Sequence, residues 1–322
     1  MRVGLDTSPL VQTQAGTARY IRGLDQLETL SGLELKRLSF GGPGKLSTVL
    51  RDAWWYPHGL PREARGLDVL HCPTFRGPVR SRVPVVVTVH DLAVLRHPET
   101  FNQWTRRYSR FAVPKVARAA RRVIAVSGFT RGEIVELLGV PAERIDVIPN
   151  AVGPPFVADG PAAEGDYVLA VGTLEPRKNL AAAQQAARRL AVPLRVVGER
   201  GWGGVQVDGW LGRVSDDELA ALYRGARCLV YPSLYEGFGI PVLEAMACGT
   251  PVVTSTGGAT EEVAGGAAVL VDPRDPATIA AGIEDACARR NELRERGLER
   301  AGRFTWDRVA RETREVYEKA AG

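Results

Sequence analysis

The residues that most constrain the fold are 235–249, which read YEGFGIPVLEAMACG. They lie between two apolar, strand-like runs, 226–231 and 251–253. Gly237 and Gly239 let the backbone come close to a ligand, and the proline that follows suits the first turn of a helix. We therefore expect a strand, a glycine-rich loop, a helix and a second strand, an arrangement typical of a phosphate-binding site.

Two glutamates flank this loop, because Glu236 falls within it and Glu244 falls in the predicted helix. Carboxylates beside a helix N-terminus can do no more than complement the helix dipole. That role needs one acid and no glycines, so two acids around a glycine-rich loop favour contact with a ligand.

Glu236 and Glu244, with seven residues between them, resemble the E-x7-E signature of retaining glycosyltransferases of the GT-B fold, in particular glycosyltransferase family 4. The similarity extends through nearly all of 212–272. It implies an α/β protein in which two Rossmann-like domains, each with a doubly wound parallel sheet, face a cleft. It also implies that Glu236 holds the donor sugar and Glu244 the ribose. The loop would contact the donor diphosphate through Gly237, Phe238, Gly239 and Ile240.

Strand-like runs alternate with helical segments along the chain, which predicts parallel, doubly wound sheets. A passage rich in Pro, Gly and Ala between about 149 and 165 is the best candidate for a linker between two domains. We expect an acceptor-binding domain over 1–155 and a donor-binding domain over 156–305. By resemblance alone, the last helix, 306–322, folds back across the first domain.

A second candidate phosphate contact is Arg177-Lys178-Asn179, which follows a predicted strand at 167–171. Asn179 is expected to cap the next helix, so both cations lie at the positive end of its dipole, where cations are disfavoured. A diphosphate would explain this placement better than two solvated cations. In the family that the sequence resembles, the matching Arg and Lys bind the donor diphosphate, and here they would stabilise the leaving group.

Gly16 and His90 are the site candidates of the N-terminal half. Gly16 resembles the glycine-rich loop of the family's acceptor domain, which approaches the donor phosphate, but it can equally serve only the turn before a helix expected to reach about residue 30. His90 ends a predicted strand at 83–89, and functional residues of parallel sheets gather at that end of the strands. The resemblance puts it near the donor sugar, although a lone histidine is often structural.

Few residues of the sequence indicate which nucleotide the donor carries. In relatives, the backbone near the position of Val214 pairs with the base and the residue matching Leu219 packs on the nucleoside. Ser215 and Glu218 between them predict a capping box. The donor is thus expected to be a nucleotide-diphosphate sugar, with GDP-mannose favoured over a UDP-sugar by likeness to bacterial mannosyl- and rhamnosyltransferases. The acceptor would be a glycan, a lipid-linked sugar or a small molecule.

Composition bears on cofactors and location. The four cysteines are widely spaced without a C-x-x-C pair, and the four histidines accompany no D-x-D triplet or His/Cys cluster. We expect buried thiols, no metal and no cofactor besides the donor substrate. No apolar run is long enough to span a membrane and the N-terminus enters a strand directly, so we expect a cytoplasmic protein. The residues carry no signal of an oligomeric state.

The segment Arg106–Arg122 gathers positive charge, because it holds seven Lys and Arg residues and no acid. It can be a solvated helix kinked at Pro114. It can also be a patch that attracts anionic lipid headgroups, with each cation contributing on the order of 1 kcal/mol. We therefore hypothesise transient contact with the inner face of the membrane, where a lipid-linked acceptor would lie.

Two other functions compete with a hexosyltransferase. A nucleotide-sugar epimerase or hydrolase could use the same architecture and the same nucleotide contacts. A nucleic-acid-binding protein is suggested by the net charge of +5. It is disfavoured because no recognised nucleic-acid motif accompanies the charge and the C-terminal half is acidic.

Overall fold

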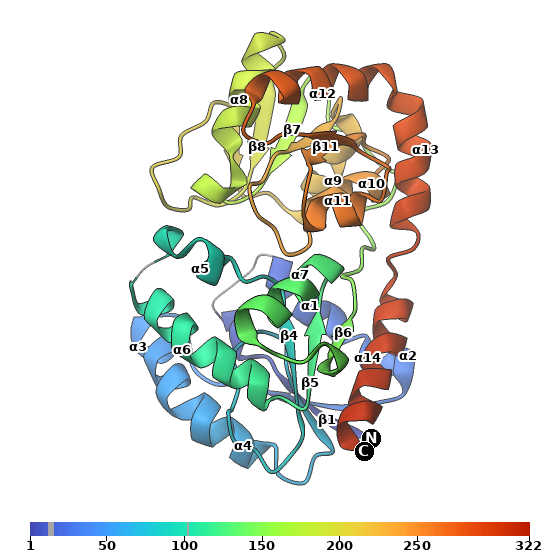
Figure 1. Ribbon diagram of the computed structural model, residues 1–322. Helices are drawn as coiled ribbons and strands as arrows, with labels where there is room; N and C mark the ends of the chain where they lie inside the picture. Colours follow the sequence, from blue (N-terminus) through green and yellow to red (C-terminus); the bar gives the residue numbers. More distant parts are fainter. Residues whose placement is uncertain (12–15, 102) are drawn as a thin grey trace. The chain divides into compact units, whose positions relative to one another are not determined.

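The structure is a computed structural model, and it describes residues 1–11, 16–101 and 103–322. The chain divides into two compact units: unit 1 comprises Met1–Ala151 and Trp306–Gly322, and unit 2 comprises Val152–Thr305. Within the described residues each unit has one six-stranded sheet, and all the strand pairs are parallel (Figure 1). The predicted α/β class with two doubly wound parallel sheets is confirmed.

Unit 1 has the strand order β2-β1-β3-β4-β5-β6. Its strands are β1 (Arg2–Asp6), β2 (Glu34–Leu38), β3 (Val69–Cys72), β4 (Val85–Val89), β5 (Arg122–Ala125) and β6 (Ile145–Val147). Its α-helices are α1 (Gly16–Leu24), α2 (Leu27–Ser31), α3 (Lys45–Leu50), α4 (Leu60–Glu63), α5 (Ala93–Arg96), α6 (Gln103–Ala119), α7 (Gly128–Glu133) and α14 (Trp306–Ala321). Short 3-10 turns form η1 (Ser8–Val11), η3 (Pro98–Thr100) and η5 (Ala142–Arg144), and π-helical turns form η2 (Arg51–Gly59) and η4 (Ile134–Leu138).

The central strands of unit 1 are apolar because both faces of the sheet are covered. Successive side chains of a strand point to opposite faces. Val85, Val87 and Val89 accordingly enter a core with α6, whereas Val86 enters a second core with α1, α2 and α14. The uninterrupted apolar run of β4 therefore follows from burial on both sides.

The C-terminal helix α14 belongs to unit 1, and Figure 1 draws it alongside α2. The Trp306 ring packs so closely on Gly23 of α1 that a Cβ atom at Gly23 would lie 1.8 Å from the ring. Further along the helix, the Tyr317 hydroxyl is 2.7 Å from Nδ1 of His71, and both side chains are buried. These contacts hold α14 on the sheet.

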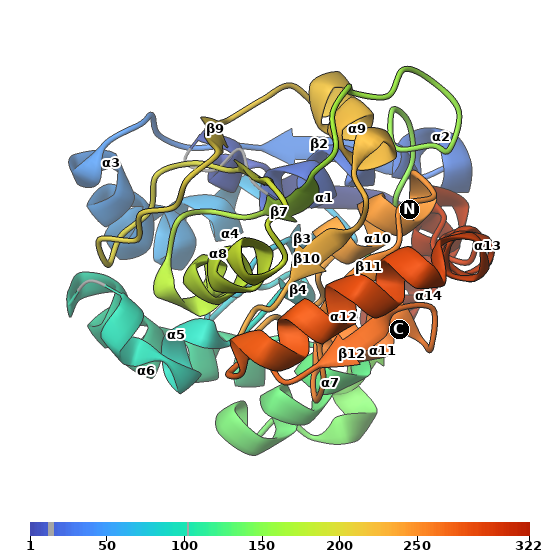
Figure 2. The ribbon, with the colours of Figure 1, turned by 90° about the horizontal axis from the view of Figure 1, so that it is seen from above.

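Unit 2 has the strand order β12-β11-β10-β7-β8-β9. Its strands are β7 (Val168–Val171), β8 (Leu194–Val197), β9 (Trp210–Gly212), β10 (Leu229–Tyr231), β11 (Val252–Ser255) and β12 (Val269–Val271). Its helices are η6 (Pro176–Lys178), α8 (Leu180–Arg189), α9 (Asp216–Gly225), α10 (Ile240–Ala247), α11 (Ala259–Ala264), α12 (Pro276–Ala288) and α13 (Arg290–Ala301). Figure 2 shows α8 and α12 side by side over one face of this sheet, with which they share a core.

The order of each sheet reverses at one point. In unit 2, β8 and β9 continue from one side of β7, whereas β10, β11 and β12 lie on its other side. In unit 1 the corresponding point lies between β1 and β3. Ligands of open α/β sheets bind beyond the carboxyl ends of the strands at such reversals. A ligand-binding site of unit 2 is therefore expected at the loops after β7 and β10.

The predicted helix from Gly16 to about residue 30 differs from the structure. It is divided into α1 and α2, because Asp25 and Gln26 donate hydrogen bonds to carbonyls three residues back rather than four. Such bonds tighten the last turn of a helix and end it.

Candidate functional site

The loops after β7 and β10 are tied together by hydrogen bonds. The Asn179 side-chain amide donates to the Pro232 carbonyl over 3.2 Å and to the Pro273 carbonyl over 2.5 Å. The Leu234 amide donates to the Arg177 carbonyl over 2.9 Å. The loops that carry Arg177, Lys178 and Glu236 thus form one connected structure at the switch point of the sheet.

Asn179 is the N-cap residue of α8, as expected, but its side chain makes no capping hydrogen bond. Its backbone is left-handed, with φ 53°. Its side-chain amide donates to the two carbonyls, and its side chain accepts no capping hydrogen bond from the helix amides. Asn tolerates this conformation better than most residues. The residue therefore begins the helix, and its side chain ties the turn to the Pro232 and Pro273 carbonyls.

Glu236 lies between two cations. Lys178 Nζ donates to Oε1 of Glu236 over 2.6 Å, and Arg177 Nη1 donates to Oε2 over 3.1 Å. The same Arg177 nitrogen donates to the Tyr235 carbonyl over 2.7 Å, and Nη2 is 2.5 Å from Oε1 of Glu175. The side chains of Lys178, Arg177 and Glu236 are 13%, 13% and 10% exposed, so solvent screens these pairs only weakly.

Tyr231 adds a hydroxyl to this cluster. It accepts a hydrogen bond from Lys178 Nζ over 3.0 Å and donates one to Oε1 of Glu236 over 2.8 Å. Tyr231 is the last residue of β10 and is buried. The Tyr231 hydroxyl therefore helps to fix the positions of the Lys178 ammonium and the Glu236 carboxylate.

The charges of the cluster set its protonation. Burial alone would raise the pKa of Glu236, but the nearby charges of Lys178 and Arg177 outweigh it and lower that pKa to about 2. Burial likewise opposes the charge of Lys178, yet the Glu236 carboxylate raises the pKa of Lys178 above its ordinary value. Burial and Glu236 also raise the pKa of Tyr231. At neutral pH the cluster thus contains an ionised carboxylate, an ammonium and a neutral phenol.

The expectation that Arg177 and Lys178 need an external anion is not supported by this arrangement. Glu236 and Glu175 already supply one carboxylate for each cation. Lys178 and Glu236 are 58 residues apart in the chain, so their contact cannot be recognised from the sequence. A bound anion would therefore join a neutral cluster rather than neutralise a positive one.

The glycine-rich loop and α10 follow the predicted pattern. Gly239 precedes the helix with φ 100°, a conformation that favours glycine, and a Cβ there would meet Thr260 Cγ2 at 2.9 Å. In the described structure the first turn of α10 has no acidic residue and no side-chain cap. Its amide groups therefore present partial positive charge at the end of the loop.

Glu244 is the fifth residue of α10, beyond the turn where the dipole acts most strongly. It is buried, and its Oε2 accepts a hydrogen bond from the Tyr223 hydroxyl over 3.0 Å. This position disfavours a role as a simple dipole complement. Phe238, in the loop before α10, is also buried, and its ring centroid is 6.0 Å from that of Phe304.

Val214 and Leu219 lie where β9 leads into α9. Val214 is half-buried after the strand, and Leu219 is buried in the helix. The predicted capping box is confirmed, because the Ser215 hydroxyl accepts from the Glu218 amide and the Glu218 carboxylate accepts from the Ser215 amide over 2.8 Å. The box fixes the turn that carries Val214.

Gly16 and His90 belong to unit 1. Gly16 is the first residue of α1, and His90 directly follows β4. His90 Nε2 is 3.0 Å from the Pro73 carbonyl, so this nitrogen carries the proton and Nδ1 is left as an acceptor. The Tyr20 ring of α1 meets the His90 ring edge to face at 4.8 Å. Burial lowers the pKa of His90, which keeps the imidazole neutral at pH 7.

Two neighbouring residues in unit 1 have structural roles. Asp91 accepts the Ala93 amide and so begins α5. The Ser127 hydroxyl accepts a hydrogen bond from the Thr130 amide over 3.0 Å and caps α7.

In the described ranges no three His, Cys, Asp or Glu side chains are grouped so that they could hold a metal ion. The four cysteines are free thiols, three of them buried.

Sequence reasoning missed Tyr231 and Glu175. Tyr231 appeared only as the end of an apolar run, and its pairing with Lys178 depends on the adjacency of β7 and β10. Glu175 precedes Arg177 by two residues, and this short spacing is the one local signal that could have suggested their ion pair.

Comparisons with known proteins show which family the chain resembles. Residues 158–303 match the family model described as Glycosyl transferases group 1, and residues 25–154 match the model described as Glycosyltransferase Family 4. O-antigen chain mannosyltransferase B of Escherichia coli is 34% identical over 281 residues, which are 77% of this chain and 74% of that protein. MMP alpha-(1->4)-mannosyltransferase of Mycolicibacterium hassiacum is 30% identical over 74% of this chain and 66% of that protein.

Solved structures with the same fold are more distant in sequence. Sucrose-phosphate synthase from Thermosynechococcus elongatus superposes with a TM-score of 0.80 at 18% identity, covering 99% of this chain and 98% of that one. HepE of Anabaena in complex with UDP and glucose has a TM-score of 0.73 at 18% identity, covering 98% of each chain. These likenesses establish the GT-B fold.

Proposed function

The chain belongs to glycosyltransferase family 4, and on that basis we propose that it moves a hexose from a nucleotide-diphosphate sugar to an acceptor hydroxyl with retention of configuration. The observation that carries this proposal is the cluster of Arg177, Lys178 and Glu236 at the switch point of the unit 2 sheet. It combines an ionised carboxylate with two cations beside a helix N-terminus. A sugar and its diphosphate need these two kinds of contact.

The diphosphate is proposed to lie against Lys178, Arg177 and the amides of Gly237–Ile240. Lys178 has three N–H donors, and its hydrogen bonds within the described structure use two of them. The third can reach a phosphate oxygen while Glu236 still holds the ammonium in place. Charge that grows on the leaving oxygen is then stabilised by groups already oriented for it.

Glu236 is proposed to accept hydroxyls of the donor sugar, and Glu244 those of the ribose. The low pKa of Glu236 keeps it an acceptor throughout the working pH range, and its charge stabilises an oxocarbenium-like transition state. The His90 imidazole, neutral and with Nδ1 as an acceptor, is proposed to hold a further hydroxyl near the reacting carbon.

GDP-mannose is the proposed donor, since the two relatives described above, at 34% and 30% identity, are mannosyltransferases by name. A UDP-sugar is the competing donor, because HepE was solved with UDP. A thermal-shift series with GDP, UDP, dTDP and ADP and their sugars decides between them. A ligand at about 100 times its Kd adds about 2.7 kcal/mol of stability, which is easily measured as a rise in Tm.

Product analysis tests the reaction itself. The purified chain should form a new glycoside from the stabilising donor only when an acceptor is present, and the product should keep the donor's anomeric configuration by NMR. Release of free sugar without acceptor would indicate a hydrolase, and conversion of the donor to another sugar nucleotide would indicate an epimerase. Either result contradicts the proposal.

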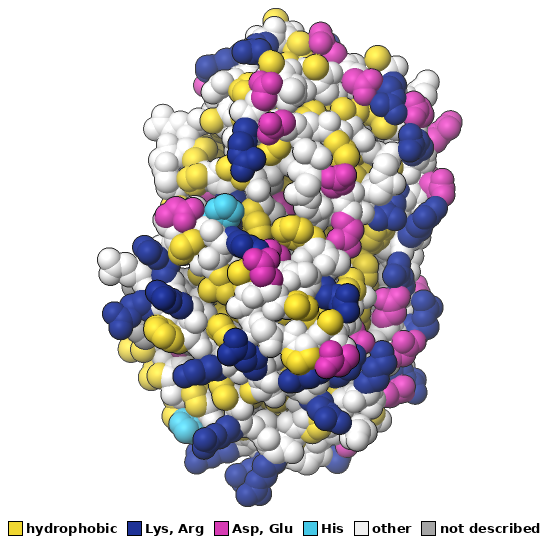
Figure 3. Space-filling view, viewed as in Figure 1, with side chains coloured by type: hydrophobic (Ala, Val, Ile, Leu, Met, Phe, Trp, Pro, Cys, Tyr) yellow, Lys and Arg dark blue, Asp and Glu magenta, His cyan; other side chains and the backbone are white. Residues whose placement is uncertain are grey.

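The acceptor is proposed to be a glycan or lipid-linked sugar reached at the cytoplasmic face of a membrane. Figure 3 shows Lys and Arg side chains over the lower left of this view, where Figure 1 draws α6. Helix α6 buries Val113 and Val116 and exposes Arg106, Arg107 and Arg110. In the described residues no helix is both long and apolar enough to span a bilayer. If the chain fails to sediment with phosphatidylglycerol vesicles at low salt, surface binding is excluded.

A further inference from the structure

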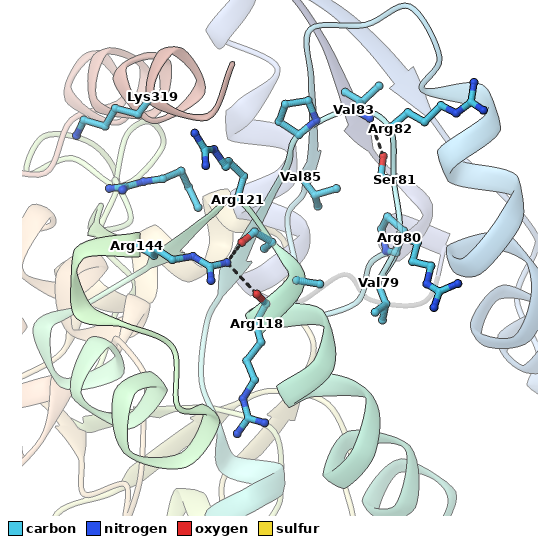
Figure 4. A pocket seen from close by; sticks show the side chains of 15 residues that line it. Val79, Arg80, Ser81, Arg82, Val83, Val85, Arg118, Arg121, Arg144 and Lys319 are labelled. Carbon is cyan, nitrogen blue, oxygen red and sulfur yellow. Dashed lines mark hydrogen bonds between the residues drawn. The ribbon is translucent and has the colours of Figure 1, made fainter. Parts of the chain in front are cut away.

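Unit 1 has a surface depression that plays no part in the proposed reaction. Its cavity volume is about 940 Å³, and none of the described residues that line it is acidic. The basic residues of its lining are Arg80, Arg82, Arg118, Arg121, Arg122, Arg144 and Lys319. In Figure 4, Arg121, Arg144 and Lys319 lie on one side of the opening and the segment 79–82 on the other.

The depression lies at the amino ends of the strands. Its walls include Val85, which begins β4, and Arg122, which begins β5, whereas His90 follows the opposite end of β4. At about 3.3 Å per residue, the five steps from Val85 to His90 separate the two places by about 16 Å. The depression is therefore not part of the site that contains His90.

Hydrogen bonds to backbone carbonyls hold several of these cations in place. Arg144 Nη2 donates to the Arg118 carbonyl over 2.9 Å and to the Ala120 carbonyl (Figure 4). Arg118 Nε donates to the Leu138 carbonyl over 2.6 Å. A neutral carbonyl orients a guanidinium without cancelling its charge. The wall is thus ordered and still positive.

One carboxylate adjoins the cluster. Asp146 accepts from Arg122 Nη2 over 2.6 Å and from Lys319 Nζ over 3.0 Å. In the part of the chain that the structure describes, no acidic side chain is paired with the exposed residues Arg80, Arg82 and Arg121. Seven cations against one acid repel one another, and an anion with several charges would relieve this repulsion.

We propose that this depression is a binding site for a compact anion that carries two or more phosphate groups. Guanidinium groups match phosphate geometry with paired N–H donors, and a volume of about 940 Å³ admits a diphosphate together with an attached group. The same chemistry can come from a soluble phosphate compound or from the headgroup of a lipid. The site is separate from the donor diphosphate site of unit 2.

The proposal is tested by calorimetric titration of the full chain with pyrophosphate at low salt. The triple variant Arg80→Gln, Arg82→Gln, Arg121→Gln should bind pyrophosphate at least about tenfold more weakly, since each lost charge-assisted contact is worth about 1.5 kcal/mol or more. The matched control is Arg22→Gln, Arg62→Gln, Arg65→Gln, which removes equal charge from exposed positions of unit 1 outside the depression and should leave the affinity nearly unchanged. Circular dichroism melting confirms that both variants fold.

Pyrophosphate can also bind at the donor site, so Lys178→Ala is titrated in parallel and should retain the binding assigned to the depression. If Lys178→Ala alone abolishes binding, or if both arginine triples weaken it equally, the proposal is overturned. Vesicles with cardiolipin, whose headgroup carries two phosphates, distinguish the source of the phosphate. Weaker sedimentation of the depression variant than of the control variant, without pyrophosphate binding by the wild type, identifies a lipid headgroup. No effect in either assay overturns the proposal.

Discussion

The aliphatic part of Lys178 lies against Gly172, the residue that follows β7. A Cβ atom at Gly172 would be 3.2 Å from both Cγ and Cδ of Lys178, which is closer than ordinary van der Waals contact. The absence of a side chain at Gly172 therefore leaves the space that Lys178 needs to reach Glu236. Gly172, which has no catalytic group of its own, thus determines where the Lys178 ammonium lies.

Gly172→Ala should displace Lys178 and weaken donor binding. Overpacking by one methyl group costs about 1 kcal/mol or more, and the cost falls on the side chain that must move. The donor KM is expected to rise several-fold with little change in the circular dichroism spectrum. A donor KM equal to that of the wild type would show that Lys178 does not need this space.

Lys178→Ala should raise the donor KM and lower kcat while the protein remains folded. The variant loses the phosphate contact in both the ground state and the transition state, and kcat/KM should fall by about tenfold or more. Arg189→Ala, which removes an exposed cation at the end of α8, is the matched control and should behave like the wild type. Normal kinetics for Lys178→Ala would refute the diphosphate role.

Tyr231→Phe should lower kcat more than it raises KM. The variant keeps the buried ring but leaves Glu236 and Lys178 without a shared hydrogen-bond partner, so the carboxylate is less well oriented. The free energy of unfolding should fall by about 1–2 kcal/mol. Tyr167→Phe is the control, because the Tyr167 hydroxyl donates to the Leu222 carbonyl over 2.8 Å in the same unit. If both variants lose stability and both keep kcat, Tyr231 is only structural.

Ionisation of Glu236 should contribute stability that depends on pH. Its pKa is about 2 in the folded protein and about 4.5 ordinarily, so the contribution is fully present above pH 4.5 and is lost as the pH falls toward 2. The difference corresponds to about 3 kcal/mol.

Urea unfolding at several pH values checks this contribution. Between about pH 5 and about pH 3, the wild type should lose more free energy of unfolding than Glu236→Gln does. Glu284→Gln, at an exposed position of α12, should follow the wild type. Identical pH dependence in the wild type and Glu236→Gln would argue against the ion pairs.

Transfer activity is expected to survive treatment with EDTA. The reason is that N–H donors of Lys178 and of the first turn of α10 can contact the leaving diphosphate directly, which is the role that a metal ion would otherwise have. Initial rates should be equal in EDTA and in added Mg²⁺ or Mn²⁺. A rate that appears only with a divalent cation would contradict the proposed mechanism.

Local patterns in the sequence determined the order of elements and the position of the loop between β10 and α10. Short continuous apolar runs, glycine in a left-handed turn and proline in a first helical turn are each properties of a few adjacent residues. The same locality made the Ser215–Glu218 capping box predictable. It placed Asn179 at the start of α8, but it could not show the partners of the Asn179 side chain, because Pro232 and Pro273 lie far away along the chain.

Only the tertiary structure decided which charges meet. The order β10-β7 makes Tyr231 and Glu236 neighbours of Lys178, although 53 and 58 residues separate them in the chain. The fold of unit 1 likewise joins His71 to Tyr317 across 246 residues and gathers the cations of the depression from four separate segments. Such pairings depend on strand order and burial, and neither is encoded within the few residues that a sequence motif covers.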